Sequence, residues 1–129
     1  MTEDYSMSRL PNPFVEYNGI EICEISMDHC LVKATIADHS KNPYGMVHGG
    51  LMYTMIDAAS AINARADGHR YVTNNVYVDY LGNGKDLDVI YAESNIIKRG
   101  KNVAVVEAKV RTEEGKVLAI GNVNMFRID

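Results

Sequence analysis

Apolar and polar residues alternate along the chain in a way that predicts strands at both ends of the sequence. Between Gly19 and Ala37 the alternation breaks near Met27, which predicts a hairpin. Four later segments are rich in β-branched and aromatic residues and are separated by short turns: Tyr71 to Leu81, Leu87 to Lys98, Asn102 to Thr112 and Lys116 to Ile128. The pattern therefore predicts six strands.

One segment has a helical pattern, and it is apolar nearly all round. It runs from about Gly49 to Ala66, and the only charge between Leu51 and Ala64 is that of Asp57. Such a helix must be buried on nearly every side, so we expect the strands to wrap it. Consecutive strands without helical crossovers predict an α+β fold, in which an antiparallel six-stranded sheet curls around one central helix.

Length and charge narrow the class of protein. A chain of 129 residues predicts a single domain, with residues 1–18 as an irregular lead-in anchored by Phe14 and Val15. Thirteen lysines and arginines against 17 acids leave a net charge of −4, which argues against nucleic acid or an anionic membrane as partner. Acids near the start and the lack of a long apolar segment predict a cytoplasmic protein.

The loop before the helix carries the candidate chemistry. It places His48, Gly49 and Gly50 at the positive end of the helix, where first-turn N–H groups are available to a developing oxyanion and glycines let a substrate come close. The glycine pair taken alone favours a simple tight turn. Asp57 is either a paired core acid or a functional carboxylate, because burying a lone charge is costly. On composition the two interpretations of Asp57 are even.

The spacing of Gly49 and Asp57 bears on oligomeric state. Eight residues along a helix span about 12 Å, which is too far for both groups to act on one carbonyl within a single chain. If the two residues cooperate, a second subunit is required. An unpaired sheet edge and the apolar surface of the helix also favour a homodimer.

These residues resemble a known family motif. The chain has Asn42-x-x-Gly45-x-x-His48-Gly49-Gly50, an acid nine residues after the histidine, and a strand from Val72-Thr73 to Tyr80-Leu81. The pattern resembles hotdog-fold acyl-CoA thioesterases of the phenylacetate-degradation (PaaI-like) branch. The resemblance extends from about Phe14 to Phe126. It implies a dimer or a dimer of dimers that hydrolyses thioesters at the subunit interface.

The same resemblance implies roles for individual residues. Gly49 would donate its N–H to the thioester oxygen, and Asp57 of the other subunit would be the base or the nucleophile. His48 and Asn42 would shape the oxyanion side, and Thr73 would hold the attacking water. No metal or cofactor is implied, since coenzyme A enters only as part of the substrate.

The remaining hypotheses concern a basic hairpin that could bind coenzyme A and two alternative functions. Lys98, Arg99 and Lys101 lie where related enzymes often meet the phosphates of coenzyme A, although such a hairpin is more often a solvated turn. A hydratase-type hotdog enzyme is the weaker rival, because Asp38 lies four residues before Asn42 and does not fit the hydratase spacing. A non-catalytic acyl-CoA binding protein is the other rival, although a pure binder would have little use for Asp57.

Overall fold

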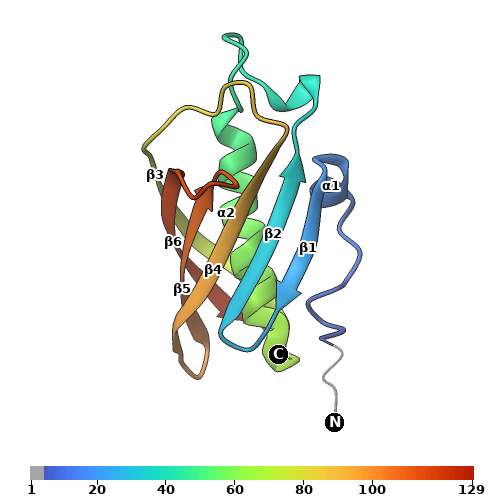
Figure 1. Cartoon of the computed structure of the whole chain (residues 1–129). Helices are drawn as coiled ribbons and strands as arrows, with labels where there is room; N and C mark the ends of the chain where they lie inside the picture. Colours follow the sequence, from blue (N-terminus) through green and yellow to red (C-terminus); the bar gives the residue numbers. More distant parts are fainter. Residues whose placement is uncertain (1–4) are drawn as a thin grey trace.

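Six antiparallel strands form one sheet in the order β1-β2-β4-β5-β6-β3 in the computed structural model, which describes residues 5–129 (Figure 1). The predicted fold class is confirmed, and each strand lies close to its predicted segment. The strands are β1 (Ile20–Ile25), β2 (His29–Thr35), β3 (Tyr71–Tyr80), β4 (Val89–Arg99), β5 (Val103–Arg111) and β6 (Val117–Arg127). Because successive side chains of a strand point to opposite faces, every second residue of β5 is buried on the inner face of the sheet: Ala104, Val106, Ala108 and Val110.

The central helix α2 (Gly49–Ala64) lies along the inner face of the curved sheet (Figure 1). Its apolar side chains pack with those of the strands in one core, and Met55, Ile56 and Ala59 are completely buried. The helix ends two residues before the predicted Ala66, because the chain tightens into a 3₁₀ turn, η2 (Arg65–Asp67). A second 3₁₀ turn, η1 (Asp38–Ser40), follows β2.

The sheet leaves one side of α2 uncovered. Tyr53 is 42% exposed, and Thr54, Asp57 and Ala61 are half-buried. Tyr53 and Thr54 are adjacent, and Asp57 and Ala61 follow at spacings of three and four, so the four residues share one face of the helix and form what we call the open stripe. The expectation that α2 is buried on nearly every side is therefore wrong for this stripe within one chain, because the sheet wraps only the opposite sides.

The segment before β1 is more ordered than predicted. A short helix, α1 (Pro13–Tyr17), interrupts the expected irregular lead-in, because Asn12 caps it by accepting the Val15 N–H at 3.3 Å and Pro13 suits the first helical position. Phe14 is 65% exposed, so it is not the predicted anchor, whereas Val15 packs against the core. The first four residues of the predicted lead-in lie outside the described residues.

The two edge strands of the sheet differ in length and cover. The shorter, β1, has α1 packed beside it, whereas β3 has ten residues and is paired only with β6. Exposed apolar side chains on and just after β3 are Val72, Tyr77, Tyr80 and Leu81. Within residues 5–129, none of the helices has the length and apolar character needed to cross a bilayer.

Candidate active site

The loop that leads into α2 is held by its own polar groups. The Asn42 side-chain oxygen accepts the backbone N–H groups of Tyr44 at 2.9 Å and Met46 at 3.1 Å. The backbone N–H of Val47 donates to the Gly84 carbonyl, and that of His48 donates to the Ser40 carbonyl, both at 2.7 Å. Asn42 therefore acts through the shape of the loop, which positions His48 at the start of the helix.

The His48 side chain caps α2 by accepting a hydrogen bond from the backbone N–H of Gly50. Its Nδ1 accepts the Gly50 N–H at 2.7 Å, so the proton of a neutral His48 ring lies on Nε2. A Cβ at Gly50 would lie 2.9 Å from that Nδ1, which explains why glycine is needed there. The Gly50 N–H is thus already used within the chain, and the expectation that Gly50 lets a substrate come close stays a prediction.

The Gly49 N–H is left for a ligand. Among residues 5–129 it donates no hydrogen bond. It is a first-turn donor at the positive end of a 16-residue helix, where a developing negative charge is stabilised. The structure therefore gives Gly49 the free donor that its predicted role requires.

Tyr80 is a site residue that the sequence analysis did not single out. Its hydroxyl donates to the Gly49 carbonyl oxygen at 2.7 Å, and its ring lies where a Cβ at Gly49 would sit 3.2 Å away. Burial raises the pKa of Tyr80, with the nearby Tyr53 adding to the shift, so the hydroxyl stays protonated near neutral pH. Its position at the end of the motif strand was the only sequence signal.

Asp57 lies on the open stripe of α2, about two helical turns after Gly49. The Thr73 hydroxyl donates to its Oδ1 at 2.6 Å, a short distance typical of a bond to an ionised acceptor. Within residues 5–129 Asp57 forms no ion pair. Asp57 is thus a half-buried carboxylate with a hydroxyl partner, and it acts on Arg65 without a contact ion pair. Both interpretations of Asp57, paired core acid and functional carboxylate, stay open.

A β-bulge in β3 brings Thr73 and Tyr80 to the same side of the sheet. Residues seven apart in a regular strand point to opposite faces. The pairing of β3 with β6 shifts by one residue between Thr73 and Asn75, and this shift reverses the alternation beyond it. Both side chains therefore reach α2, Thr73 at Asp57 and Tyr80 at Gly49.

A groove of about 760 Å³ opens beside Asp57. It lies between the open stripe of α2 and the segment of residues 8–16, with the start of β1 as a further wall. Its size is that of pockets that hold small molecules. Sequence patterns did not predict it, because its walls come from segments separated by some 40 residues of chain.

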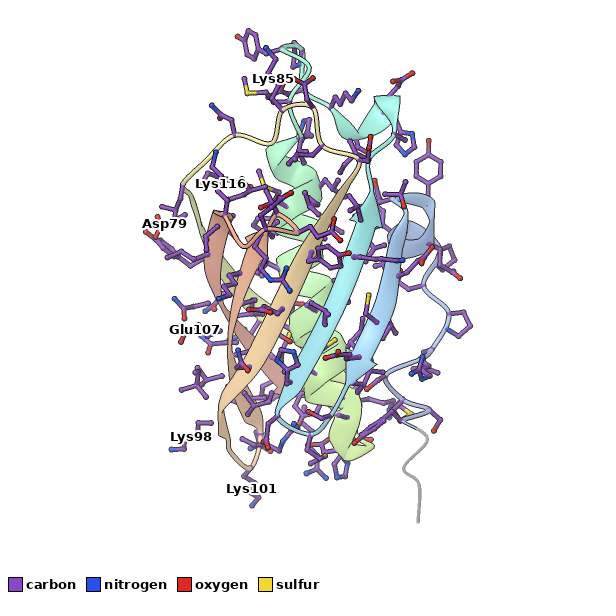
Figure 2. The ribbon with its side chains drawn as sticks, in the orientation of Figure 1. Asp79, Lys85, Lys98, Lys101, Glu107 and Lys116 are labelled. Atoms are coloured by element: carbon purple, nitrogen blue, oxygen red, sulfur yellow. The ribbon has the colours of Figure 1, made fainter. Side chains whose placement is uncertain are left out.

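The basic hairpin between β4 and β5 divides into two kinds of residue. Arg99 is bound at the C-terminal end of α2, where it donates to the Ala64 carbonyl at 2.8 Å and pairs with Asp67 at 2.9 Å. Arg99 therefore has partners within the chain, and its predicted contact with coenzyme A stays a prediction. Figure 2 shows Lys98 and Lys101 at the end of the molecule where α2 stops, opposite the end where it begins.

One chain thus carries two half-sites on one helix. The first is the Gly49 N–H with its flanking His48 and Tyr80, and the second is Asp57 with Thr73. The rise of α2 separates the two by about 12 Å. A donor for an oxyanion and an oriented carboxylate are the groups that hydrolysis of an activated acyl compound uses.

Comparisons with known proteins agree with this chemistry. The Thioesterase superfamily matches residues 44–119. The chain is 24% identical to the acyl-coenzyme A thioesterase PaaI of Escherichia coli over 110 residues, 85% of this chain and 79% of that protein. The solved structure of E. coli PaaI matches with a TM-score of 0.89 and 21% identity, covering 98% of this chain and 91% of that one. A Streptococcus mutans protein bound to acetyl CoA matches with a TM-score of 0.80 and 26% identity, covering 84% and 88%.

The chain belongs to the thioesterase superfamily and is an enzyme of the PaaI-like hotdog type. The family match covers the end of the loop, α2, β3, β4 and β5, and so includes both half-sites.

Proposed function

We propose that this protein hydrolyses acyl-CoA thioesters to the free acid and coenzyme A, at a site that two copies of the chain share. The observation that carries the proposal is the pair of half-sites on α2, a free Gly49 N–H and an Asp57 carboxylate oriented by Thr73. The names of the relatives support coenzyme A as the thiol.

The reaction is an acyl transfer to water. The Gly49 N–H polarises the thioester carbonyl, and Asp57 takes a proton from a water that attacks the carbonyl carbon. The tetrahedral intermediate then collapses, the carbon–sulfur bond breaks, and the proton on Asp57 passes to the departing thiolate. In the second route open to this carboxylate, Asp57 attacks the carbonyl carbon, the carbon–sulfur bond breaks and the thiolate leaves with a proton from water, and water then hydrolyses the resulting anhydride. The Thr73 hydroxyl fixes Oδ1 in either route, and its lone pairs can accept a hydrogen bond from the water.

The partner copy is expected to add to the exposed edge of β3. This long edge carries several apolar side chains and no lysine or proline, the residues that commonly block edge-to-edge pairing. Antiparallel pairing about a two-fold axis would set the Thr73 end of one strand beside the Tyr80 end of the other. Because Thr73 contacts Asp57 and Tyr80 contacts Gly49, this arrangement brings Asp57 of one chain toward Gly49 of its partner. A dimer of dimers remains part of the proposal.

The same two-fold symmetry allows Lys98 and Lys101 of one chain to bind the coenzyme A phosphates at the site that begins with Gly49 of its partner. They lie at the opposite end of α2 from Gly49 in one chain (Figure 2). An antiparallel partner would bring its own hairpin to the Gly49 end. Lysine charges there would contribute binding remote from the reacting carbon.

Thiol release from a panel of acyl-CoA esters, measured with a chelator present, tests the proposal. We expect release without metal or added cofactor, because the site supplies a donor and a carboxylate. Complete loss of activity on chelation would show the mechanism to be wrong. Loss of enoyl absorbance without thiol would indicate hydration instead, and binding with neither change would indicate a non-catalytic acyl-CoA binding protein.

A further inference from the structure

Charge is unevenly distributed along the groove beside Asp57. Arg9 and Arg65 line it, and both lie at the end where α2 stops, because the Arg65 Nε donates to the Met7 carbonyl at 2.9 Å and the Ser8 hydroxyl donates to the Ile62 carbonyl at 2.6 Å. The lining acids other than Asp57 are on α1 and at the start of β1, toward the other end (Figure 1).

The wall between Asp57 and the arginines is apolar. It is formed by Leu10, Ile22, Ala58, Ala61 and Ile62. The side-chain hydroxyls that line the groove are already donating to backbone carbonyls, Ser8 to Ile62 and Thr54 to Gly50. A hydrocarbon arm fits this apolar wall better than the amide groups of the pantetheine arm of coenzyme A, whose burial against it would cost free energy.

Neither arginine, Arg9 or Arg65, is in contact with an acidic side chain in the part of the chain that the structure describes. Arg65 is half-buried, and burial lowers its pKa, while the charge of Asp57 acts in the opposite direction. Burial of the Arg65 cation is costly because Asp57 acts on it without a contact ion pair, and an anion bound in contact would offset that cost.

We infer that the acyl arm of the thioester lies in this groove and that Arg65 and Arg9 bind a carboxylate at its far end. The inference rests on the proposed function, since it requires the thioester carbon to lie at Asp57. Arg65 lies about 12 Å beyond Asp57 along the helix, and an extended chain advances roughly 1.2 Å per bond. Allowing for the reach of the arginine side chain, the fitting substrates are dicarboxylic acyl-CoA esters of about six to ten carbons.

Octanoyl-CoA and suberoyl-CoA, which differ only in the terminal carboxylate, provide the test. The measured quantity is the ratio of kcat/KM for suberoyl-CoA to that for octanoyl-CoA. We expect the wild-type ratio to be about tenfold or more, the size of effect typical of a charge-assisted hydrogen bond. Arg65→Met should abolish most of this preference, Arg9→Met part of it, and Arg65→Lys should retain some because the charge remains.

Arg70→Met is the matched control, because Arg70 is an exposed arginine beyond the end of α2 that pairs with Asp129 and does not line the groove. It should leave the ratio unchanged. Thermal unfolding checks each variant, and Arg9→Met decides the question if Arg65→Met fails to fold. Equal rates on the two esters in the wild type, with thiol release intact, would overturn this inference alone. No release from any ester would overturn the proposed function.

Octanoyl-pantetheine, which lacks the nucleotide, separates the two sources of negative charge. If the arginine variants weaken both CoA esters equally and leave octanoyl-pantetheine unaffected, the arginines bind the phosphates of coenzyme A, and the inference is wrong.

Discussion

Asp57 and Thr73 are the residues on which the chemistry depends most directly. The carboxylate is half-buried and accepts one short hydrogen bond from Thr73. An amide at this position keeps the shape of the side chain and an oxygen for that bond, and it removes only the charge and the basicity. The Asp57→Asn variant therefore distinguishes a core acid from a reacting carboxylate.

Asp57→Asn should lower kcat by roughly 10²–10⁴ while the melting temperature stays near that of the wild type. Thr73→Ala should cost less, because it disorders the carboxylate without removing it. Thr73→Ser is the matched control, since it keeps the hydroxyl. Steady-state kinetics on one good acyl-CoA ester measures all three. Near-full turnover by Asp57→Asn would mean that Asp57 has only a structural role.

At the scale of elements, the end of α2 is stabilised by β4, an interior strand of the sheet that packs against the helix. Arg99 of β4 donates to the Ala64 and Met27 carbonyls, both at 2.8 Å, and its ion pair with Asp67 is largely buried. A cation at this position also offsets the negative end of the helix dipole. Arg99 thus connects the hairpin, the helix end and the β1–β2 turn.

Arg99→Met should lower the free energy of unfolding by about 2 kcal/mol, because the part-buried Ala64 carbonyl and the Asp67 charge lose their partner. Lys101→Met, an exposed change in the same hairpin, should stay within about 0.5 kcal/mol of the wild type. Chemical denaturation measures both. Equal stability of the two variants would contradict the structural role of Arg99.

At the scale of the whole molecule, the question is which chains contribute to each site. Gly49→Pro removes the oxyanion donor at a helix position that tolerates proline, and His48 before it is already in the extended conformation that proline favours. Gly49→Ala is its control, because it keeps the N–H and adds the same Cβ against the Tyr80 ring. The difference between these two variants therefore measures the N–H.

Mixing Gly49→Pro with Asp57→Asn should restore activity that neither variant has alone. If each site takes Gly49 from one chain and Asp57 from the other, a mixed dimer has one intact site. Random reassociation of equal amounts makes half the dimers mixed, so about a quarter of the wild-type activity should return. Both variants must first be shown to fold, to dimerise and to exchange subunits. Under those conditions, the absence of recovery would show that the two residues do not share a site across the interface.

Local patterns in the sequence were sufficient for the elements and for the main candidates. The alternation of apolar residues predicted the strands, and the uniformly apolar segment predicted α2, because these signals come from neighbours along the chain. The glycines after His48 and the lone Asp57 stood out for the same reason. Local patterns failed for α1, where a cap and a proline outweigh the absence of periodicity.

Tertiary contacts decided what each of these residues does. Tyr80 and Gly49 are 31 residues apart, and Arg99 and Ala64 are 35 apart, so no local pattern connects them. The bulge after Thr73 places Thr73 and Tyr80 on one face, although their spacing alone would separate them. The groove forms, and Arg9 and Arg65 both line it, only because the N-terminal segment packs beside α2. Alternation and composition are properties of neighbours in the chain, whereas a shared face, a free donor and a groove depend on which distant segments pack together.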